Sequence, residues 1–106
     1  MLKIHKSLAP IKVAVLPLVK NKPDLVKKAK EIYQTIKTEF FCQYDEIGSI
    51  GRRYRRQDEV GTIFCVTVDF ETLEKEDVTI RDRDTMKQER IKVSELKEIL
   101  KEKLNV

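Results

Sequence analysis

Four arginines stand close together in residues 48–61, which read GSIGRRYRRQDEVG. If this segment is helical from Ile50, steps of 100° per residue place all four within one arc of the helix and leave the small and apolar side chains on the other side. They are Arg52, Arg53, Arg55 and Arg56. Guanidinium groups prefer planar partners such as phosphates, carboxylates and base edges. The segment therefore predicts either a surface for RNA or phosphate, or a solvated face that pairs with nearby carboxylates.

A second group with possible chemistry is the alternation of arginine and aspartate at residues 81–84. On a strand, Arg81 and Arg83 share one face, and Asp82 and Asp84 share the other, more apolar face. Neighbouring arginines can donate to pyrimidine O2 and N3 atoms or to phosphates. For the aspartates we favour structural pairing, with helix amides or with the arginines of residues 52–56.

A third group ends the segment TIFCVTVDF at residues 62–70. Thr67, Asp69 and Phe70 combine a hydroxyl, a carboxylate and an aromatic ring at the end of a predicted strand. Readers of single-stranded bases use such a set, because the ring stacks on a base and the polar groups bond its edge. Alternatively, Phe70 belongs to the core with the apolar residues of the same strand. The pattern leaves both interpretations open.

Five strands and three helices are predicted to position these groups, in the order β-α-β-α-β-β-β-α. β-branched and apolar runs predict strands, apolar residues at helical spacing predict helices, and residues 71–77 are expected to be a polar connection. The strands are expected at residues 12–19, 41–44, 62–70, 78–84 and 88–93, and the helices at residues 23–40, at 50–60 after an N-cap at Ser49, and after Ser94. This order predicts an α/β fold, a mixed sheet covered by helices.

The length and charge of the chain indicate its number of domains and the kind of partner it can meet. The chain of 106 residues suits one domain with a single core, and residues 1–9 are expected to be a loose segment. The net charge is +4, and it is unevenly spread: residues 1–30 hold eight lysines and one aspartate, whereas residues 62–80 hold five acidic side chains and one lysine. A mild basic excess of this kind assists an encounter with a polyanion.

Catalytic and metal sites are not indicated. His5 is the only histidine and lies in the segment expected to be loose, so nucleophilic catalysis has no well-placed base. Cys42 and Cys65 have no CxxC spacing, and a reduced, buried pair is favoured over a disulfide or metal site. No apolar run is long enough for a membrane span, and the start lacks the apolar stretch of a signal peptide. We therefore expect a cytoplasmic chain without catalytic residues or a metal.

Three stretches carry a family resemblance: LAPIKVAVLPL, then SIGRRYRRQDEVGT followed by VTVDF, then TIRDRDTM. Over about residues 8–100 they resemble the C-terminal anticodon-binding domain of class II glycyl-tRNA synthetases. Related domains of the histidyl, prolyl and threonyl enzymes are less similar in these motifs. The resemblance implies an α/β fold with a mixed five-stranded sheet flanked by three helices. It also implies binding to tRNA for glycine, whose anticodon ends in two cytidines.

The resemblance also assigns site residues. In this family, the cytidines are held by the first arginine of GRRY, the end of the TVDF strand and the second arginine of RDRD. These positions are Arg52, Thr67, Asp69, Phe70 and Arg83. Other basic side chains are expected to hold phosphates without reading sequence. These candidates are Arg53, Arg55, Arg56, Arg81, Lys20 and Lys22.

The whole enzymes that the chain resembles ligate glycine to tRNA with ATP and magnesium, and they are commonly homodimers through other domains. Their aminoacylation domain, with its three class II motifs, is not among these 106 residues. We therefore expect this chain to supply recognition, with no cofactor of its own. The alternative is a free-standing accessory module that binds a protein or another RNA.

Overall fold

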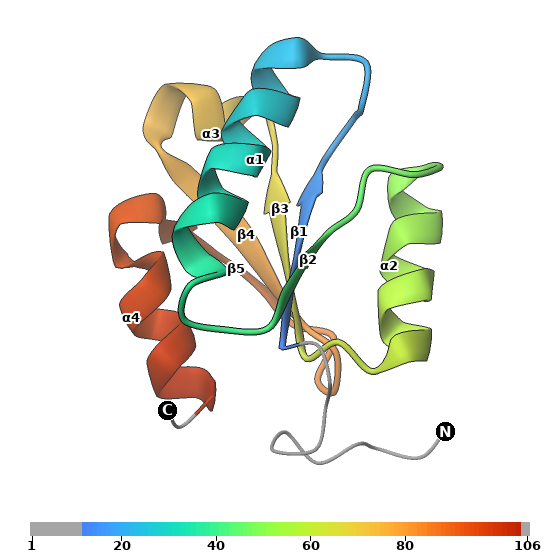
Figure 1. Ribbon diagram of the computed structural model, residues 1–106, viewed down its shortest axis with the longest axis vertical. Helices are drawn as coiled ribbons and strands as arrows, with labels where there is room; N and C mark the ends of the chain where they lie inside the picture. The colour runs from blue at the N-terminus through green and yellow to red at the C-terminus, as the bar shows by residue number, and fades with distance from the viewer. Residues whose placement is uncertain (1–11, 105–106) are drawn as a thin grey trace.

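A five-stranded mixed sheet organises the computed structural model, which describes residues 12–104 (Figure 1). The strand order is β2-β1-β3-β4-β5, with β1 parallel to β2 and β3, and β4 antiparallel to β3 and β5. The strands are β1 (Val13–Pro17), β2 (Cys42–Tyr44), β3 (Phe64–Val68), β4 (Asp77–Asp82) and β5 (Gln88–Lys92). The predicted α/β fold with a mixed sheet is confirmed. The loose segment expected at residues 1–9, with His5, lies outside the described residues.

Four helices accompany this sheet among the described residues, one more than expected. They are α1 (Pro23–Ile36), α2 (Ile50–Val60), α3 (Phe70–Lys75) and α4 (Val93–Leu104). The polar connection predicted at residues 71–77 is wrong, because most of it is α3. Asp69 and Thr72 form a capping box at its start, and Glu76 ends it in the left-handed conformation, with φ 55°. A helix of six residues has no room for the apolar periodicity that indicates a longer one.

The other helix boundaries follow local signals. Ser49 accepts a hydrogen bond from the Arg52 amide, as an N-cap should, and Pro23 lies in the first turn of α1. Gly61 ends α2 with φ 84°, a conformation that favours glycine. The last helix begins at Val93, one residue before the expected cap at Ser94. No described helix is long and apolar enough to cross a membrane.

The two faces of the sheet are covered differently, with α1 and α4 on one side and α2 on the other (Figure 1). Alternate residues of each strand point to opposite faces. Thus Val13 and Val15 of β1 join the larger core under α1 and α4, whereas Ala14 and Leu16 join a smaller cluster with Cys65. Ile50 and Tyr54 of α2 pack against that smaller cluster.

The part of the α2 face formed by β4 and β5 carries polar side chains instead. Thr79 of β4 lies opposite Thr67 of β3 on one side and Arg90 of β5 on the other. These three residues therefore share one face of the sheet, and Arg81 follows Thr79 on that same face. We call Thr67, Thr79, Arg81 and Arg90 the polar sheet face.

Candidate nucleic-acid interface

The arginines of α2 separate into inward and outward groups. Arg53 is only 2% exposed, so its expected place on a solvent-facing arc is wrong. Its guanidinium donates to the Gly48 carbonyl at 2.8 and 3.2 Å and to the Pro17 carbonyl. Arg52 and Arg55 are exposed. Charge on a helical wheel could not show that Arg53 turns inward, because its partners are main-chain carbonyls of other segments.

Arg56 is intermediate between the inward and the outward arginines of α2. It donates to Asp45 Oδ2 at 2.5 Å and to the Ile47 carbonyl at 3.2 Å. Asp45 is buried and also accepts from the Ile47 amide and from Gln57. Burial works to raise the pKa of Asp45, but the hydrogen bonds from Arg56, the Ile47 amide and Gln57 outweigh it and lower that pKa. This group ties α2 to the loop after β2.

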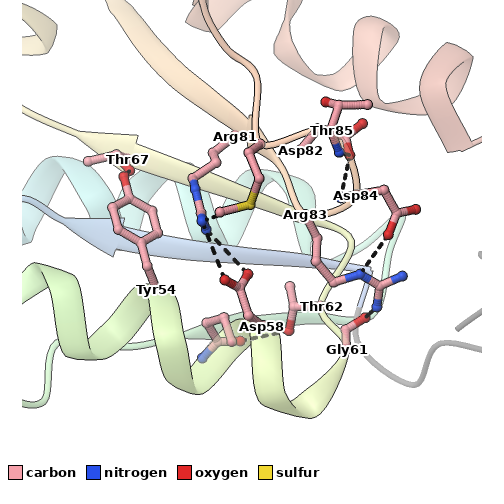
Figure 2. A network of polar contacts seen from close by, with 12 residues as sticks. Tyr54, Asp58, Gly61, Thr62, Thr67, Arg81, Asp82, Arg83, Asp84 and Thr85 are labelled. Atoms are coloured by element: carbon pink, nitrogen blue, oxygen red, sulfur yellow. Dashed lines mark hydrogen bonds and ion pairs between the residues drawn. The ribbon is translucent and has the colours of Figure 1, made fainter. Parts of the chain in front are cut away.

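Arg81, on the polar sheet face, holds the middle of α2 (Figure 2). Its guanidinium makes two hydrogen bonds to Asp58, at 3.2 and 3.3 Å, and lies over the Tyr54 ring at 4.8 Å. The Tyr54 hydroxyl in turn shares a hydrogen bond with the Thr67 hydroxyl. Thr67 and Arg81 are both buried. Both residues therefore connect α2 with the sheet.

Arg83 lies at the amino end of β3. Its main-chain amide donates to the Ile63 carbonyl, and its side chain donates to the Gly61 carbonyl at 2.6 Å and to Asp84 at 3.2 Å (Figure 2). It is 9% exposed. The carboxylate of Asp82 accepts from the Asp84 and Thr85 amides in the β4–β5 turn. The expected pairing of these aspartates with the arginines of α2 is therefore wrong, although Asp84 does form an ion pair with Arg83.

The carboxyl end of β3 is different in character. Phe70 is the first residue of α3 and is 50% exposed, so the interpretation that placed it in the core is wrong. Asp69 caps α3 and also accepts from Arg90 at 2.8 and 3.1 Å. The hydrogen bonds from Arg90 lower the pKa of Asp69, so this carboxylate is ionised at neutral pH.

Arg90 had not been singled out in the sequence. It stands in QERIK of an edge strand, where alternating charge is typical of a solvated surface. Besides Asp69 it contacts Asp77 at 2.5 Å and Thr79 at 3.3 Å. The signal that could have found it is strand register, since Arg90 lies directly opposite Thr79.

The sheet topology decides which candidates come together. β1 and β3 are parallel neighbours, so their carboxyl ends lie at the same end of the sheet. α2 begins there too, because Arg53 donates to the last residue of β1. Five of the residues expected to touch RNA therefore belong to this end or to the loop after β1, and all five are exposed or half-buried at the surface. They are Lys20, Lys22, Arg52, Asp69 and Phe70.

Thr67 approaches this end but is buried, and Arg83 is far from it. Arg83 is bonded to Ile63, and a rise of about 3.3 Å per residue puts Ile63 about 16 Å from the last residue of β3. The structure thus does not bring Arg83 together with Phe70. Arg83 and Phe70, both expected to hold the cytidines, therefore lie near opposite ends of β3.

Comparison with known proteins identifies the fold. A family described as the anticodon binding domain matches residues 12–103, nearly all of the described chain. The chain belongs to this family. This chain is also 57% identical over 103 residues to a glycine–tRNA ligase of Clostridium acetobutylicum, and 56% identical over 95 residues to a glycine–tRNA ligase of Ruminiclostridium cellulolyticum. The resemblance to glycyl-tRNA synthetases is confirmed.

The matches cover the anticodon-binding domain almost completely and the relatives only partly. They include 97% and 90% of this chain but 22% and 20% of the two ligases. The chain therefore spans about a fifth of the length of these relatives. Fold and family therefore agree on an anticodon-binding domain.

The described part of the anticodon-binding domain offers little for covalent or metal chemistry. Residues 12–104 hold no group of three histidine, cysteine, aspartate or glutamate side chains that could bind a metal ion. Cys42 and Cys65 are free thiols, and burial raises the pKa of each to about 12. Both therefore remain protonated at neutral pH, where a thiol is a poor nucleophile and metal ligand.

Proposed function

We propose that this domain binds the anticodon loop of tRNA for glycine and reads its two cytidines at the carboxyl end of β3. The observation that carries the proposal is the half-exposed ring of Phe70 beside the Asp69 carboxylate. An exposed ring at the start of a helix offers a stacking surface for an unpaired base, and such stacking contributes about 1–3 kcal/mol per base.

The polar groups of this end match the edge of cytosine. Cytosine presents an amino group at N4 and acceptors at O2 and N3, so an ionised carboxylate suits the first and a guanidinium the others. In this proposal Asp69 accepts from N4, and Arg52 donates to O2 or N3. Uridine carries a keto oxygen at the position of N4 and would face the carboxylate with a second acceptor.

The remaining basic side chains fall into two groups. Lys20, Lys22 and Arg55 are exposed and would hold phosphates, and Arg56 would contribute the N–H groups that Asp45 and the Ile47 carbonyl leave open. The buried arginines and Thr67 would hold α2 in place against the rest of the fold. We assign this supporting role to Arg53, Arg81 and Arg83.

The wider activity belongs to the same proposal. The relatives are ligases, and this chain spans about a fifth of their length. Joined to the remaining four fifths, the domain would select tRNA for glycine in the cytoplasm. The rest of such an enzyme would supply aminoacylation with ATP and magnesium, and the contacts of a homodimer.

Binding of glycine-tRNA anticodon stem-loops tests the proposal. Affinity is measured at one fixed salt concentration for the stem-loop with both cytidines and for two variants in which either cytidine is replaced by uridine. We expect at least tenfold weaker binding of a uridine variant, and a loss of tenfold or more for Phe70→Ala on the cytidine stem-loop.

Phe41→Ala is the matched control. Phe41 is 76% exposed but precedes β2, at the amino end of the parallel strands, so its loss should leave RNA affinity nearly unchanged. Equal affinity of the Phe70 and Phe41 variants would contradict stacking at the carboxyl end of β3. Equal affinity of the wild type for all stem-loops would favour a non-selective accessory module instead.

A further inference from the structure

Arg90 joins three acidic side chains around the proposed base site. Its guanidinium contacts Asp69 at 2.8 and 3.1 Å, Asp77 at 2.5 Å and Glu71 at 3.6 Å. The acidic residues come from the end of β3, the start of β4 and the first turn of α3. Arg90 itself stands on β5, and its side chain is 34% exposed. One cation on an edge strand therefore holds together the elements that surround Phe70.

The hydrogen bonds of Arg90 leave it little capacity for an RNA ligand. Nη1 donates to Asp69 and Thr79, and Nη2 donates to Asp69 and Asp77. The Nε atom faces Glu71. A guanidinium has five N–H donors, and the two terminal nitrogens have each found two acceptors. Arg90 is thus a poor candidate for direct contact with a base and a good one for holding other groups in place.

The group that Arg90 holds is the carboxylate of Asp69. Its Oδ1 atom accepts from the Thr72 amide, the Thr72 hydroxyl and Arg90, whereas Oδ2 accepts from Arg90. A carboxylate has about four acceptor positions in two pairs, so the open position is on Oδ2. Arg90 contacts both oxygens, and it therefore fixes the rotation of the carboxylate and the direction of that open position.

The same contact fixes the start of α3. Asp69 is the N-cap, and Phe70 is the next residue, so the ring is presented by the capped turn. Without Arg90, the carboxylates of Asp69, Glu71 and Asp77 would lose their common cation and repel one another. Rotation of Asp69 would then weaken both the cap and the placement of the ring.

We propose that Arg90 is a positioning residue for base recognition, which holds Asp69 so that one open acceptor meets the exocyclic amino group of cytosine and Phe70 stays in stacking position. This inference rests on the proposed function. It agrees with the lowered pKa of Asp69, for which Arg90 is the main cause. An ionised carboxylate accepts hydrogen bonds and does not donate them, which suits an amino group and not a keto oxygen.

A double-mutant cycle on base discrimination tests this role. The quantity measured is the ratio of dissociation constants for the uridine and cytidine stem-loops, in wild type, Arg90→Gln, Asp69→Asn and the double variant. We expect Arg90→Gln to lower the wild-type ratio at least threefold and to leave the ratio of the Asp69→Asn background unchanged. A purely electrostatic or structural contribution would weaken both RNAs alike and leave the ratio as it was.

Lys92→Gln is the matched control, because Lys92 stands two residues along β5 on the same face and its removal takes away the same charge. Its side chain contacts the Lys75 carbonyl at 3.5 Å, and we expect the wild-type ratio. Melting curves establish that each variant is folded. Arg90→Lys keeps the charge near Asp69 and should recover part of the ratio, and it replaces Arg90→Gln if the latter does not fold.

The outcomes separate the two proposals. A wild-type ratio near one would contradict the proposed function itself. A clear wild-type ratio that Arg90→Gln and Lys92→Gln both retain would overturn only the role of Arg90. An equal further loss when Arg90→Gln is added to Asp69→Asn would also overturn it, because Arg90 would then act without Asp69.

Discussion

Arginines near the two ends of β3 serve opposite purposes. At the amino end of β3, Arg83 donates to the Gly61 carbonyl and Arg81 to Asp58, and both arginines are buried. At the carboxyl end, Phe70 is half exposed and Arg52 is exposed. The first end attaches α2 to the sheet, and the second presents groups to a partner.

Burial explains the difference. A buried guanidinium must find acceptors, because an unpaired charge in the interior is very costly. The amino end supplies them as a helix C-cap carbonyl and two carboxylates, so its arginines cannot be released for RNA without a large cost. Arg52, in the first turn of α2, is exposed, and within residues 12–104 its guanidinium has no buried acceptor of this kind. An arginine motif thus divides into structural and surface members according to which acceptors lie within reach.

The largest expected effect concerns the inward arginine of α2. Arg53→Ala removes the donors to the Gly48 and Pro17 carbonyls and leaves a buried space. Hydrogen bonds from a charged group contribute about 1.5–3 kcal/mol, so we expect a loss of about 3 kcal/mol in the free energy of unfolding. Urea denaturation measures it, and Arg55→Ala, an exposed neighbour, should change stability by about 0.5 kcal/mol or less. Similar stabilities for both variants would contradict the inward role.

The second-largest expected effect comes from a comparison of one variant at each end of β3. Arg83→Ala removes the donor to the Gly61 carbonyl at the end of α2, and we expect about 2 kcal/mol lower stability with cytidine discrimination retained. Phe70→Ala should lower cytidine discrimination and leave stability nearly unchanged, because half of that ring is already exposed. Denaturation and stem-loop binding are measured on both variants. If Arg83→Ala lost discrimination at unchanged stability, Arg83 would be a base reader and the division of the two ends would be wrong.

Much of this fold was predictable because its signals are local or periodic. The apolar runs of β1 and β3 indicate strands that are buried on both faces, and the spacing of Leu25, Ala29 and Ile32 indicates a helix, α1, with one buried face. The short helix α3 was missed because its signal is a cap. Asp69 and Thr72 carry that signal three residues apart, and a polar stretch with acidic residues hides it.

The site was less predictable because its key relations join distant segments. Family motifs pointed to Asp69 and Phe70, but no spacing along the chain shows that Arg53 meets Pro17 or that Arg90 meets Asp69. Those contacts depend on strand register and on where a helix begins over the sheet. A charge pattern indicates that an arginine needs an acceptor, whereas the fold determines which acceptor lies within hydrogen-bonding distance of it.

The smallest expected effect concerns acid stability on the α2 side of the sheet. The pKa of Asp45 is lowered below its ordinary 3.8, so ionised Asp45 stabilises the fold above that value and loses this contribution as pH falls through the lowered pKa. Asp45→Asn removes the pair with Arg56, and we expect about 1 kcal/mol lower stability at pH 7.

The difference between Asp45→Asn and wild type should stay constant from pH 7 to about pH 4 and shrink below pH 3.8, which urea denaturation at a series of pH values measures. Glu59→Gln changes an exposed carboxylate on the outer side of α2 and serves as control. A difference that grows on acidification would show that Asp45 is harder to ionise in the folded state, and the pairing with Arg56 would then be a net cost.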